Sequence, residues 1–534
     1  MHPLLPATLQ DQYLREGHWT NQTLAAVVSA QAREFPDRSA VLGNRPFTYS
    51  ELDLAGRRLA ANLTKCVAPG DVIVAMLDTS WVCVVAAVAA SRLGAQLLPL
   101  APKVPALRAE ELTKNLAAKV VLITQSALSE SSPQWWTSPT VARVIRHGAD
   151  GSSSAYIALD DVLSAAGDFD EIRGDAHESR LLVQTEGSTG QSKVVMQSEN
   201  ALFYSSRWYA NSQGLNEQSR YLGLGPNGHV LTSCFMVYAP LLAGASVLPY
   251  EGWQPSEVAQ LVKQHGLTAS LMSATHVFDL LRLDPTDLDQ LRSLNTIAAG
   301  GKPDHFFPEF EKITGATILR CYGMSECPIH TMVAAKDRAS YGDTDGRTFQ
   351  GSELQVVGAS GPDDVGEAYV RGPGLFLGYF GRPDLTKAAT TDDGFYRTGD
   401  LVRKNQQGVS LSGRTKDTIR RGSLTIFPSE VESKLKTHRA VFDVAVVGLP
   451  DERLGERPAA AVVLNPGTTL TLEELVEHLQ SQGVAKYALP ESLHLMTKLP
   501  TSTVGKLNKR LLRDLLSQEQ VQLLKPNESH TRGS

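Results

Sequence analysis

The chain is 534 residues long, with 42% hydrophobic residues, 20% charged residues and a formal net charge of −6. A single hydrophobic core is improbable at this length, so we expect about three or four compact units in a globular protein of ordinary composition. The negative balance, without any run rich in lysine and arginine, argues against broad nucleic-acid binding.

The N-terminal residues and the apolar runs give no indication of a membrane protein. Residues 1–10 lack the basic and apolar regions of a signal peptide. The most apolar run, residues 82–90, is far shorter than the roughly 20 residues that span a bilayer. The five cysteines are scattered without a Cys-x-x-Cys pair, which fits a reducing compartment and neither a disulfide framework nor a zinc site. We therefore expect a soluble, cytoplasmic protein.

Strand-like apolar runs alternate with helix-like stretches through most of the chain. The pattern predicts strands at 72–77, 96–100 and 120–123, and helices at 82–93 and 106–117. This alternation is typical of parallel α/β layers.

A second set of α/β units is predicted over residues 180–329, and strand and turn residues over 356–378 and 409–411 indicate a small β-barrel. Beyond the Gly-Arg-Thr-Lys-Asp segment at 413–417, strands at 441–449 and 459–464 and a helix at 472–482 predict a further compact unit. Residues 148–155 read as an exposed loop and 525–534 as a disordered polar tail. The predicted class is α/β, with an N-terminal domain over 1–415 and an α+β C-terminal domain over 416–534.

A loop rich in small residues follows the apolar run at 181–183. Residues 185–193 read Thr-Glu-Gly-Ser-Thr-Gly-Gln-Ser-Lys. The N–H groups and hydroxyls of such residues can point at phosphate oxygens, and the lysine adds a positive charge. The spacing Gly-x-x-Gly-x-x-Lys differs from that of a P-loop. Taken alone, the segment is either a phosphate-binding turn or an ordinary flexible one.

Further motifs follow in order toward the C-terminus. They read Cys-Tyr-Gly-Met-Ser-Glu at 321–326, Tyr-Arg-Thr-Gly-Asp-Leu at 396–401, Gly-Arg-Thr-Lys-Asp at 413–417 and Pro-Thr-Ser-Thr-Val-Gly-Lys at 500–506. Their order and spacing resemble the adenylate-forming superfamily of acyl-CoA synthetases, peptide-synthetase adenylation domains and beetle luciferases. The resemblance runs from the Phe-Thr-Tyr-Ser-Glu-Leu segment at 47–52 to Lys506. It is strongest to stand-alone carboxylic acid ligases, both acyl-CoA synthetases and coronafacate-ligase-like enzymes.

The resemblance implies ATP-dependent activation of a carboxylic acid. A carboxylate is a poor electrophile, and joining it to AMP gives a mixed anhydride with a good leaving group and releases pyrophosphate. Such an enzyme must position the acid in line with the α-phosphorus and neutralise the developing charge. In the resembling family Lys193 and the loop hold the triphosphate, Glu326 carries Mg²⁺ as a hard oxygen ligand, and Lys506 reaches the reacting oxygens.

The remaining implied roles concern the nucleotide and the C-terminal lid. Asp400 would accept hydrogen bonds from the ribose, with Arg414 beside it, and the lid would rotate about Lys416 between two half-reactions. The residues implied to bind ATP are Thr185, Gly187, Ser188, Thr189, Gly190, Lys193, Gly300, Gly301, Lys302, Tyr322, Gly323, Met324, Ser325, Asp400 and Arg414.

The phosphate loop departs from the family pattern at three positions. Glu186 stands where the family commonly has Ser, Ser192 where it has Pro, and Val194 where it has Gly. A carboxylate beside a triphosphate would repel ATP unless it points away or meets a cation. A nucleotide-binding regulator without turnover is therefore one alternative, whereas the retained Lys506 favours an active enzyme.

The segment at 228–236 bears on the choice of acid. Adenylation domains for amino acids hold the substrate ammonium with an aspartate here, and this segment has no acidic residue. An unpaired ammonium would be costly in such a pocket, which makes an α-amino acid a poor substrate. The side chains of His229, Phe235, Met236, Tyr238 and Met324 instead suggest a mostly apolar cavity for a medium-sized aliphatic, alicyclic or aromatic acid, and Gly323 is also expected to bind the substrate. His229 is either a pocket residue or part of the core.

The acceptor stays open between two classes. Thioester-forming relatives have a Gly-Gly pair after the hinge, where the pantetheine thiol approaches, and this chain has Gly422 and Ser423. Coenzyme A is the commoner acceptor in the family, and a free amine such as an amino acid is the rival. No carrier segment follows Lys506 in this sequence, so an acyl carrier protein would be a separate partner.

Overall fold

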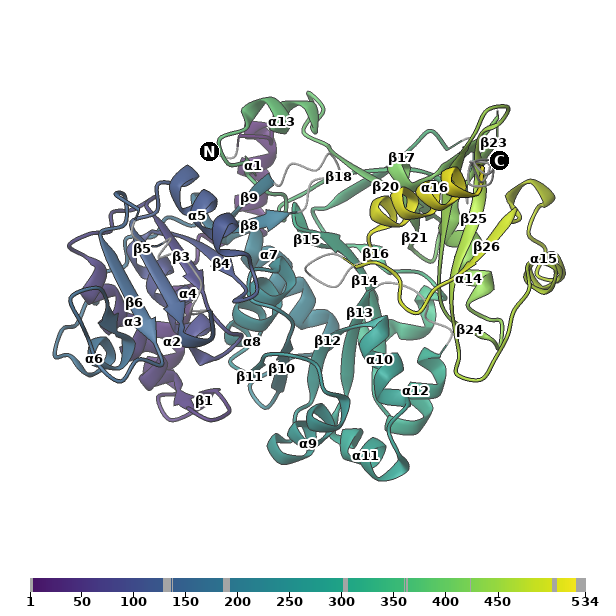
Figure 1. Cartoon of the computed structure of the whole chain (residues 1–534). Coiled ribbons are helices and arrows are strands. Elements are labelled where there is room, and N and C mark those ends of the chain that lie inside the picture. The colour runs from purple at the N-terminus through teal and green to yellow at the C-terminus, as the bar shows by residue number, and fades with distance from the viewer. Residues whose placement is uncertain are drawn as a thin grey trace, which may run out of the picture. The chain divides into compact units, whose positions relative to one another are not determined.

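Two mainly parallel sheets with flanking helices make up the larger part of the computed structural model (Figure 1). The structure describes residues 3–127, 136, 138–185, 193–300, 306–359, 361, 364–422, 424–501 and 507–524, and only the backbone of 519–524. The chain divides into two units, the first formed by Met1–Gln355, Tyr369–Thr398 and Lys404–Ser410. The second is formed by Val356–Ala368, Gly399–Arg403 and Leu411–Ser534, so residues 356–368, 399–403 and 411–415, which were predicted to belong to the N-terminal domain, fall in this unit.

The first sheet of the larger unit has eight strands in the order β19-β9-β8-β4-β3-β5-β6-β7. Strands β4, β3, β5, β6 and β7 are parallel, and β8 joins β4 in parallel, whereas β9 and β19 add an antiparallel edge. The strands are β3 (Val72–Met76), β4 (Gln96–Leu100), β5 (Val120–Thr124), β6 (Arg143–His147), β7 (Ile157–Ala158), β8 (Ser179–Thr185), β9 (Lys193–Ser198) and β19 (Gly378–Tyr379). The strands predicted at 72–77, 96–100 and 120–123 are confirmed.

The second sheet has nine strands in the order β16-β15-β14-β13-β12-β10-β11-β1-β2. Its parallel part includes β10, β11, β12, β13 and β14. The chain continues from β10 to β11 on one side and then to β12 on the other side of β10, so the strand order reverses at β10. Ligands of such sheets bind outside the carboxyl ends of the strands, at this switch point. The strands are β1 (Ser39–Val41), β2 (Phe47–Thr48), β10 (Arg220–Leu224), β11 (Ser246–Tyr250), β12 (Ala269–Ser273), β13 (Thr296–Gly300), β14 (Thr317–Met324), β15 (Cys327–Met332) and β16 (Arg347–Thr348).

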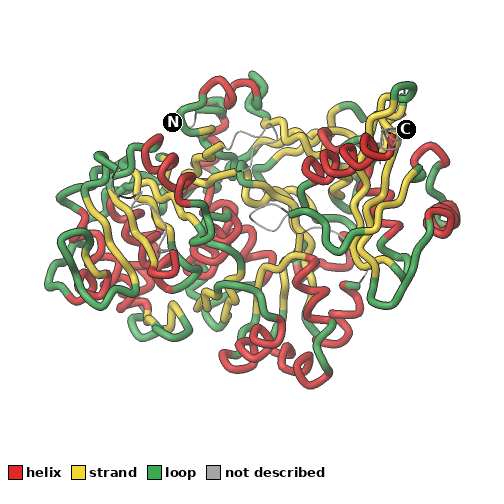
Figure 2. The backbone as a smooth tube through the Cα atoms, in the orientation of Figure 1, coloured by secondary structure: helices red, strands yellow, loops and turns green. Residues whose placement is uncertain are grey.

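Helices cover both sheets, and the alternation of helices and strands along the chain can be followed in Figure 2. The predicted helices at 82–93 and 106–117 are confirmed as α4 (Trp81–Leu93), which ends at Gly94 in the left-handed conformation, and α5 (Ala106–Asn115). The other helices of this unit are α1 (Ala7–Arg15), α2 (Leu24–Glu34), α3 (Tyr49–Leu63), α6 (Leu159–Ser164), α7 (Glu199–Gln213), α8 (Ala239–Leu242), α9 (Pro255–His265), α10 (Ala274–Leu281), α11 (Pro285–Asp289), α12 (Phe307–Thr314) and α13 (Pro383–Ala388).

A π-helix of seven residues, Thr232–Tyr238, forms part of the crossover that follows β10. All its residues are buried, so the segment has no polar face that would reveal a helical period in the sequence. π-Helices are rare and frequently occur at functional sites. This one begins eight residues after the end of β10, at the switch point of the nine-stranded sheet.

A buried ion pair lies between the two sheets of the larger unit. Arg180 on β8 and Glu199 at the start of α7 are 2% and 0% exposed, with 3.6 Å between Nε and Oε2. The Oε1 atom of Glu199 accepts hydrogen bonds from the N–H of Leu24 and the hydroxyl of Ser91. Burial raises the pKa of Glu199, whereas the Arg180 guanidinium opposes that shift. The carboxylate therefore depends on its cation to remain charged inside the core.

The second unit is built on a five-stranded sheet, in which four strands have the order β23-β22-β25-β24 and β26 pairs in parallel with the inner strand β25. The predicted strands at 441–449 and 459–464 and the helix at 472–482 are confirmed as β24 (Val441–Asp451), β25 (Gly455–Leu464) and α15 (Leu472–Ser481). Two separate clusters of apolar side chains pack against alternate residues of β24, which places a core on each face of this sheet. The other elements are β22 (Ile419–Arg421), β23 (Leu424–Ile426), β26 (Ser492–Leu495), α14 (Pro428–Leu435) and α16 (Lys509–Leu524).

The strand-rich stretch that was predicted as a small barrel forms a four-stranded sheet. Its order is β17-β18-β20-β21, and the described residues show no pairing of β17 with β21 that would close it. The strands are β17 (Glu353–Val357), β18 (Gly366–Arg371), β20 (Tyr396–Lys404) and β21 (Val409–Arg414). No helix in the described part of the chain is long and apolar enough to cross a membrane. The loop predicted at 148–155 is confirmed, whereas the tail at 525–534 lies outside the described residues.

Candidate active site

Glu326 lies in a tight turn beyond the carboxyl edge of the nine-stranded sheet. Strand β14 pairs with β13 through Arg320 and then continues into a hairpin with β15, in which Met324 pairs with Cys327. Ser325 and Glu326 are the two residues between them. A Cβ atom on Gly323 would lie 2.2 Å from the carbonyl oxygen of Pro328, so only glycine allows this approach of the two strands.

Four side chains meet around the turn and form a cluster of Lys193, Glu326, Tyr379 and Tyr396. The hydroxyl of Tyr379 donates to Oε1 of Glu326 at 2.7 Å and lies 3.2 Å from the hydroxyl of Tyr396. The Nζ atom of Lys193 lies 4.6 Å from the centroid of the Tyr379 ring. Burial, and secondly the Glu326 carboxylate, raise the pKa of Tyr379 and of Tyr396 well above the usual range. Both hydroxyls therefore stay protonated and can donate to the carboxylate.

The loop of small residues lies between two directly paired residues. Thr185 ends β8, Lys193 begins β9, and the two are partners in the antiparallel ladder. A turn after a buried strand was predicted from the sequence, and the strands that flank this segment, β8 and β9, are antiparallel partners. Gly187, Ser188, Thr189 and Gly190, together with Glu186 and Ser192, lie outside the described residues.

Three further residues of the predicted nucleotide site line up at the ends of strands. Gly300 is the last residue of β13 and pairs with Ser273, the last residue of β12, at the carboxyl edge of the sheet. Tyr322 is buried on β14, and Ser325 accepts a hydrogen bond on its carbonyl from the side chain of Gln197 at 2.8 Å. Gly301 and Lys302 lie outside the described residues.

In the second unit, Asp400 and Arg414 form an ion pair. The distance between Oδ1 of Asp400 and Nε of Arg414 is 3.0 Å, and the Asp400 side chain is 6% exposed. Asp400 lies within β20. Lys416 lies in a short 3-10 helix (Thr415–Asp417), and Gly422 has a φ of +61°, whereas Ser423 and Lys506 are outside the described residues.

Of the residues predicted to bind the acid, His229, Phe235, Met236 and Tyr238 lie on or just before the π-helix, whereas Gly323 lies on β14. Nδ1 of His229 accepts a hydrogen bond from the N–H of Leu231, so this ring caps the start of the helix. Phe235 stacks on Tyr209 with ring centroids 4.1 Å apart, and the hydroxyl of Tyr238 lies 3.5 Å from Oε1 of Glu199. Met236 lies across Gly223 of β10, where a Cβ atom would be 2.3 Å from its Cγ. Phe235 and Tyr238 therefore contribute to the core as well as to any pocket.

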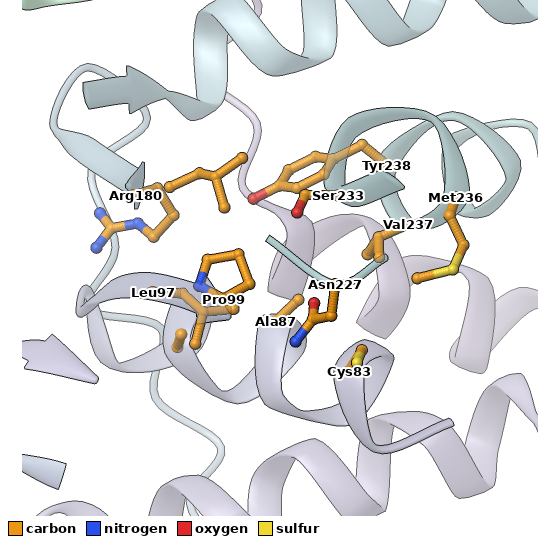
Figure 3. A pocket seen from close by; sticks show the side chains of 12 residues that line it. Cys83, Ala87, Leu97, Pro99, Arg180, Asn227, Ser233, Met236, Val237 and Tyr238 are labelled. Carbon is orange, nitrogen blue, oxygen red and sulfur yellow. The ribbon is translucent and has the colours of Figure 1, made fainter. Parts of the chain in front are cut away.

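A small cavity lies behind the π-helix (Figure 3). Its volume of about 20 Å³ is room for about one water molecule. Met236, Val237 and Tyr238 border it from the π-helix, and Leu97 and Pro99 border it from β4. Arg180 of the buried ion pair also lines it. The cavity is too small for a carboxylic acid, so it does not by itself define the substrate site.

The described residues contain no group of three or more His, Cys, Asp or Glu side chains that could hold a metal ion. Mg²⁺ is usually bound by one or two carboxylates together with substrate phosphates and water, rather than by a cage of protein ligands. A single carboxylate in a turn, with one oxygen held by Tyr379, fits such a site. Glu326 is therefore a suitable magnesium ligand in a site completed by a triphosphate.

The cysteines beside this turn are not reactive groups. Burial raises the pKa of Cys321 and of Cys327 to about 12, so neither forms a thiolate at neutral pH. His330, three residues after Cys327 on β15, is a buried titratable residue with no role predicted from the sequence. Its Nε2 lies 3.1 Å from the carbonyl oxygen of Glu353, which can only accept, so Nε2 carries the proton. Burial lowers the pKa of His330 from 6.5 to about 4.

We expect His330 to make the larger unit sensitive to acid. Its stability contribution is fully present above pH 6.5 and is lost as the pH falls toward 4, because only the unfolded chain takes up the proton in this window. A shift of this size corresponds to about 3 kcal/mol. The free energy of unfolding, measured with urea at a series of pH values, should therefore decrease less steeply toward acid pH for His330→Gln than for the parent; this part of the curve is the acid limb. The partly exposed His265, replaced by Gln, serves as the control, and equal acid limbs for parent and His330→Gln would contradict the assignment.

Tyr379 and Tyr396 are the site residues that sequence analysis missed. Tyr396 begins one of the motifs but was given no role, and Tyr379 lies on a strand of only two residues. Tyr379 and Glu326 are 53 residues apart, and nothing in the local pattern of either segment relates them.

Two family models match the sequence. Residues 28–380 match the model described as AMP-binding enzyme, and residues 430–506 match the AMP-binding enzyme C-terminal domain. The two matches leave a gap that contains β20, β21 and the segment at 413–417.

Known proteins match the chain over nearly its full length. The medium-chain fatty-acid–CoA ligase of Escherichia coli (strain K12) is 33% identical over 527 residues, which are 94% of this chain and 92% of that protein. The salicyl-AMP ligase / salicyl-S-ArCP synthetase of Mycobacterium tuberculosis (strain ATCC 25618 / H37Rv) is 30% identical over 537 residues, 95% of this chain and 93% of that protein. The crystal structure of ATP-bound MatB from Rhodopseudomonas palustris has a TM-score of 0.83 and 25% identity, and covers 92% of this chain and 99% of its own.

Proposed function

Because this chain belongs to the AMP-binding enzymes of the adenylate-forming superfamily, and is thus an ATP-dependent, AMP-forming ligase of carboxylic acids, we propose that it activates a largely apolar acid and transfers the acyl group to coenzyme A. The first half-reaction forms acyl-AMP and releases pyrophosphate. In the second, the thiol of coenzyme A attacks the acyl carbon and AMP leaves.

The observation that carries the assignment of the site is the cluster around Tyr379. It brings the lysine that ends the phosphate loop and the carboxylate of the 321–326 motif onto one side chain. A lysine and an acidic metal ligand in one place are what a magnesium-bound triphosphate requires. The magnesium ion, when bound with ATP, neutralises charge on the phosphates. Lys193 would pair with the β- and γ-phosphates, and Glu326 would hold the metal.

The remaining roles follow from the family and extend this proposal. Asp400 would accept hydrogen bonds from the ribose, with Arg414 fixing the carboxylate at 3.0 Å. Lys506 would act in the first half-reaction by neutralising charge on the reacting oxygens, and Lys416 would be the hinge of the C-terminal domain. The main boundary between domains near 415 and 416 remains part of this proposal.

The proposal of an apolar acid depends on the segment at 228–236. The ammonium group of an amino-acid substrate would need a carboxylate partner in this segment, and the segment has none. Residues 228–236 include no acidic side chain, and the described ones from Thr232 onward are buried. An ammonium placed there would lose its hydration without gaining a partner. The similarity to a fatty-acid–CoA ligase and to a salicyl-AMP ligase supports an aliphatic or aromatic acid.

The acceptor has a second candidate. Coenzyme A is supported by the full-length similarity to a CoA ligase, whereas Ser423 in place of a glycine would narrow the passage for pantetheine. A small amine, such as an amino acid, attacking the same acyl-AMP would give an amide. A separate carrier protein is the third class of acceptor, supported by the relative named as a salicyl-S-ArCP synthetase.

Pyrophosphate release tests the first half-reaction. Purified chain, ATP and magnesium are combined with a panel of fatty, alicyclic and aromatic acids, and release is measured for each acid and for the free amino acids. We expect acid-dependent release with at least one apolar acid and none with the amino acids. A folded chain that releases pyrophosphate with no member of the panel would be the nucleotide-binding regulator instead.

A competition experiment identifies the acceptor. The enzyme, ATP and the best acid of the panel are given coenzyme A and a mixture of amino acids together, and the products are separated by mass. Acyl-CoA as the main product is the expected result. An N-acyl amino acid would establish the amide ligase, and Ser423→Gly then shows whether this residue selects the acceptor.

Glu326→Gln is expected to weaken the use of magnesium without unfolding the protein, because the amide keeps the size of the side chain and loses the charge. Loss of an outer-shell partner of a metal ligand commonly costs about 10-fold to 100-fold in metal affinity, and loss of the charge on the ligand itself should cost no less, so we expect the half-saturating magnesium concentration to rise by about 10-fold or more. The measurement is acid-dependent pyrophosphate release against magnesium concentration at fixed free ATP. Glu353→Gln is the control, since this carboxylate is paired with Arg371. An unchanged magnesium dependence would place the metal elsewhere.

A further inference from the structure

Tyr379 contacts both charged residues of the proposed triphosphate site through different parts of one side chain. The face of its ring lies 4.6 Å from the ammonium nitrogen of Lys193, and its hydroxyl donates to Oε1 of Glu326 at 2.7 Å. Tyr379 is 3% exposed, whereas Lys193 and Glu326 are partly exposed, so the tyrosine is fixed in the core while both charged groups remain accessible to a ligand.

The backbone of the segment that carries Tyr379 is attached to the same two elements. Tyr379 pairs with Val195 on β9, and the N–H of Phe380 donates to the carbonyl of Val194 at 2.8 Å, next to Lys193. The N–H of Phe376 donates to the carbonyl of Glu326, also at 2.8 Å. The segment 376–380 thus connects the strand that begins at the lysine with the turn that bears the carboxylate.

A second tyrosine fixes the direction of the hydroxyl. The Tyr396 and Tyr379 oxygens are 3.2 Å apart, and Tyr379 uses its own proton for Glu326. The oxygen of Tyr379 can therefore accept from Tyr396, whose hydroxyl also interacts with Glu326 directly. A donor that is itself an acceptor is polarised and strengthened. The ring of Phe376 packs against both tyrosines, with centroid distances of 5.0 and 5.2 Å.

We infer that Tyr379 is a positioning residue that holds Glu326 in the orientation for magnesium and keeps Lys193 on its ring until the triphosphate arrives. This inference rests on the proposed function, which assigns the metal to Glu326 and the phosphates to Lys193. A carboxylate has two oxygens, so Oε1 can accept from Tyr379 while Oε2 is directed to the metal. Without the hydroxyl, the carboxylate can rotate, and it becomes an acceptor for the nearby ammonium, which would compete with magnesium and ATP.

The test measures ATP binding in the absence of any carboxylic acid. Binding is measured by isothermal titration calorimetry at a series of magnesium concentrations. Tyr379→Phe removes the hydroxyl and keeps the ring. We expect the half-saturating magnesium concentration to rise by about 10-fold, the effect of one hydrogen bond to a charged group, and binding to recover in excess magnesium. Tyr49→Phe is the matched control, because it removes another buried hydroxyl, one that donates to the carbonyl of Ala245 at 2.8 Å.

A double-mutant cycle separates this role from a general loss of packing. If Tyr379 acts through Glu326, then Tyr379→Phe should change the magnesium dependence far less in a Glu326→Gln background than in the parent. Equal effects in the two backgrounds, or a loss of ATP binding that excess magnesium does not restore, would overturn the inference. Tyr396→Phe should give a smaller shift in the same direction.

The results for the parent protein distinguish a failure of the positioning role of Tyr379 from a failure of the proposed function. Magnesium-dependent ATP binding by the parent with no change in Tyr379→Phe would refute the positioning role alone and leave the proposed function in place. No magnesium-dependent binding by the folded parent would refute the assignment of the site, and the inference with it.

Discussion

Replacing Lys506 with alanine is expected to reduce acyl-AMP formation by at least about 100-fold, because charge stabilisation by one well-placed group commonly contributes that much. Transfer of the acyl group from pre-formed acyl-AMP should remain close to that of the parent. The two half-reactions separate because the proposal uses this lysine only while the carboxylate attacks the α-phosphorus. The measurements are acid-dependent pyrophosphate release for the first step, and consumption of synthetic acyl-AMP with coenzyme A for the second.

The exposed Lys498, replaced by alanine, is the matched control for this experiment and should leave both steps unchanged. If Lys506→Ala slowed both steps equally, the lysine would not belong to one half-reaction, and the proposed hinge at Lys416 would lose its reason. If neither step changed, the family role would not apply to this residue.

Replacing Arg180 with methionine is expected to lower the free energy of unfolding by about 3–5 kcal/mol, the usual result of breaking a buried ion pair from one side. Glu199 is fully buried and would be left without its cation, and the carbonyls of Ala95 and Asp175 would lose the hydrogen bonds that Arg180 donates. Urea unfolding followed by far-ultraviolet circular dichroism measures the change. Arg382→Met, which breaks an exposed ion pair with Asp384, should change little.

The double variant Arg180→Met/Glu199→Gln distinguishes the loss of charge balance from the loss of packing. A neutral amide can still accept the hydrogen bonds from Leu24 and Ser91, so we expect the double variant to be more stable than Arg180→Met alone. A double variant that is less stable than the single one would show that the Glu199 carboxylate is favourable even without Arg180, through the hydrogen bonds that it accepts.

Much of the architecture was predictable because it depends on patterns repeated along the chain. The apolar runs that became β3, β4 and β5 are buried on both faces and bounded by helices, which is the arrangement that a parallel sheet imposes on a sequence. The family was also predictable, and the two family models confirm it. Its motifs lie in turns and at strand ends, where backbone geometry restricts the choice of residue. Gly323 illustrates the restriction, because no side chain fits beside Pro328.

The features that were not predictable depend on contacts between distant segments or on local geometry without a period. The role of Tyr379 depends on its contacts with Glu326 and Lys193, which are distant in the sequence. Its own strand has only two residues, too few to show an alternation of buried and exposed positions. The π-helix follows i→i+5 bonding in a segment that is apolar throughout, so the sequence resembles any buried helix. The predicted acid-binding residues were chosen as an apolar set, and the structure shows that Phe235 and Tyr238 also hold the core together.

The pairing of β8 with β9 determines where residues can be inserted or deleted in this part of the chain without displacing Lys193. Thr185 and Lys193 face each other as the last paired residues, so the segment between them can gain or lose residues at a small cost in closure entropy. An insertion of one residue within β9 would instead shift the register and turn Lys193 to the opposite face of the sheet, away from Tyr379. For the pairing of the two strands, a change of length is therefore tolerated between Thr185 and Lys193 and not within 193–198, whereas the proposed binding of phosphates by the loop adds a separate restriction on its own residues.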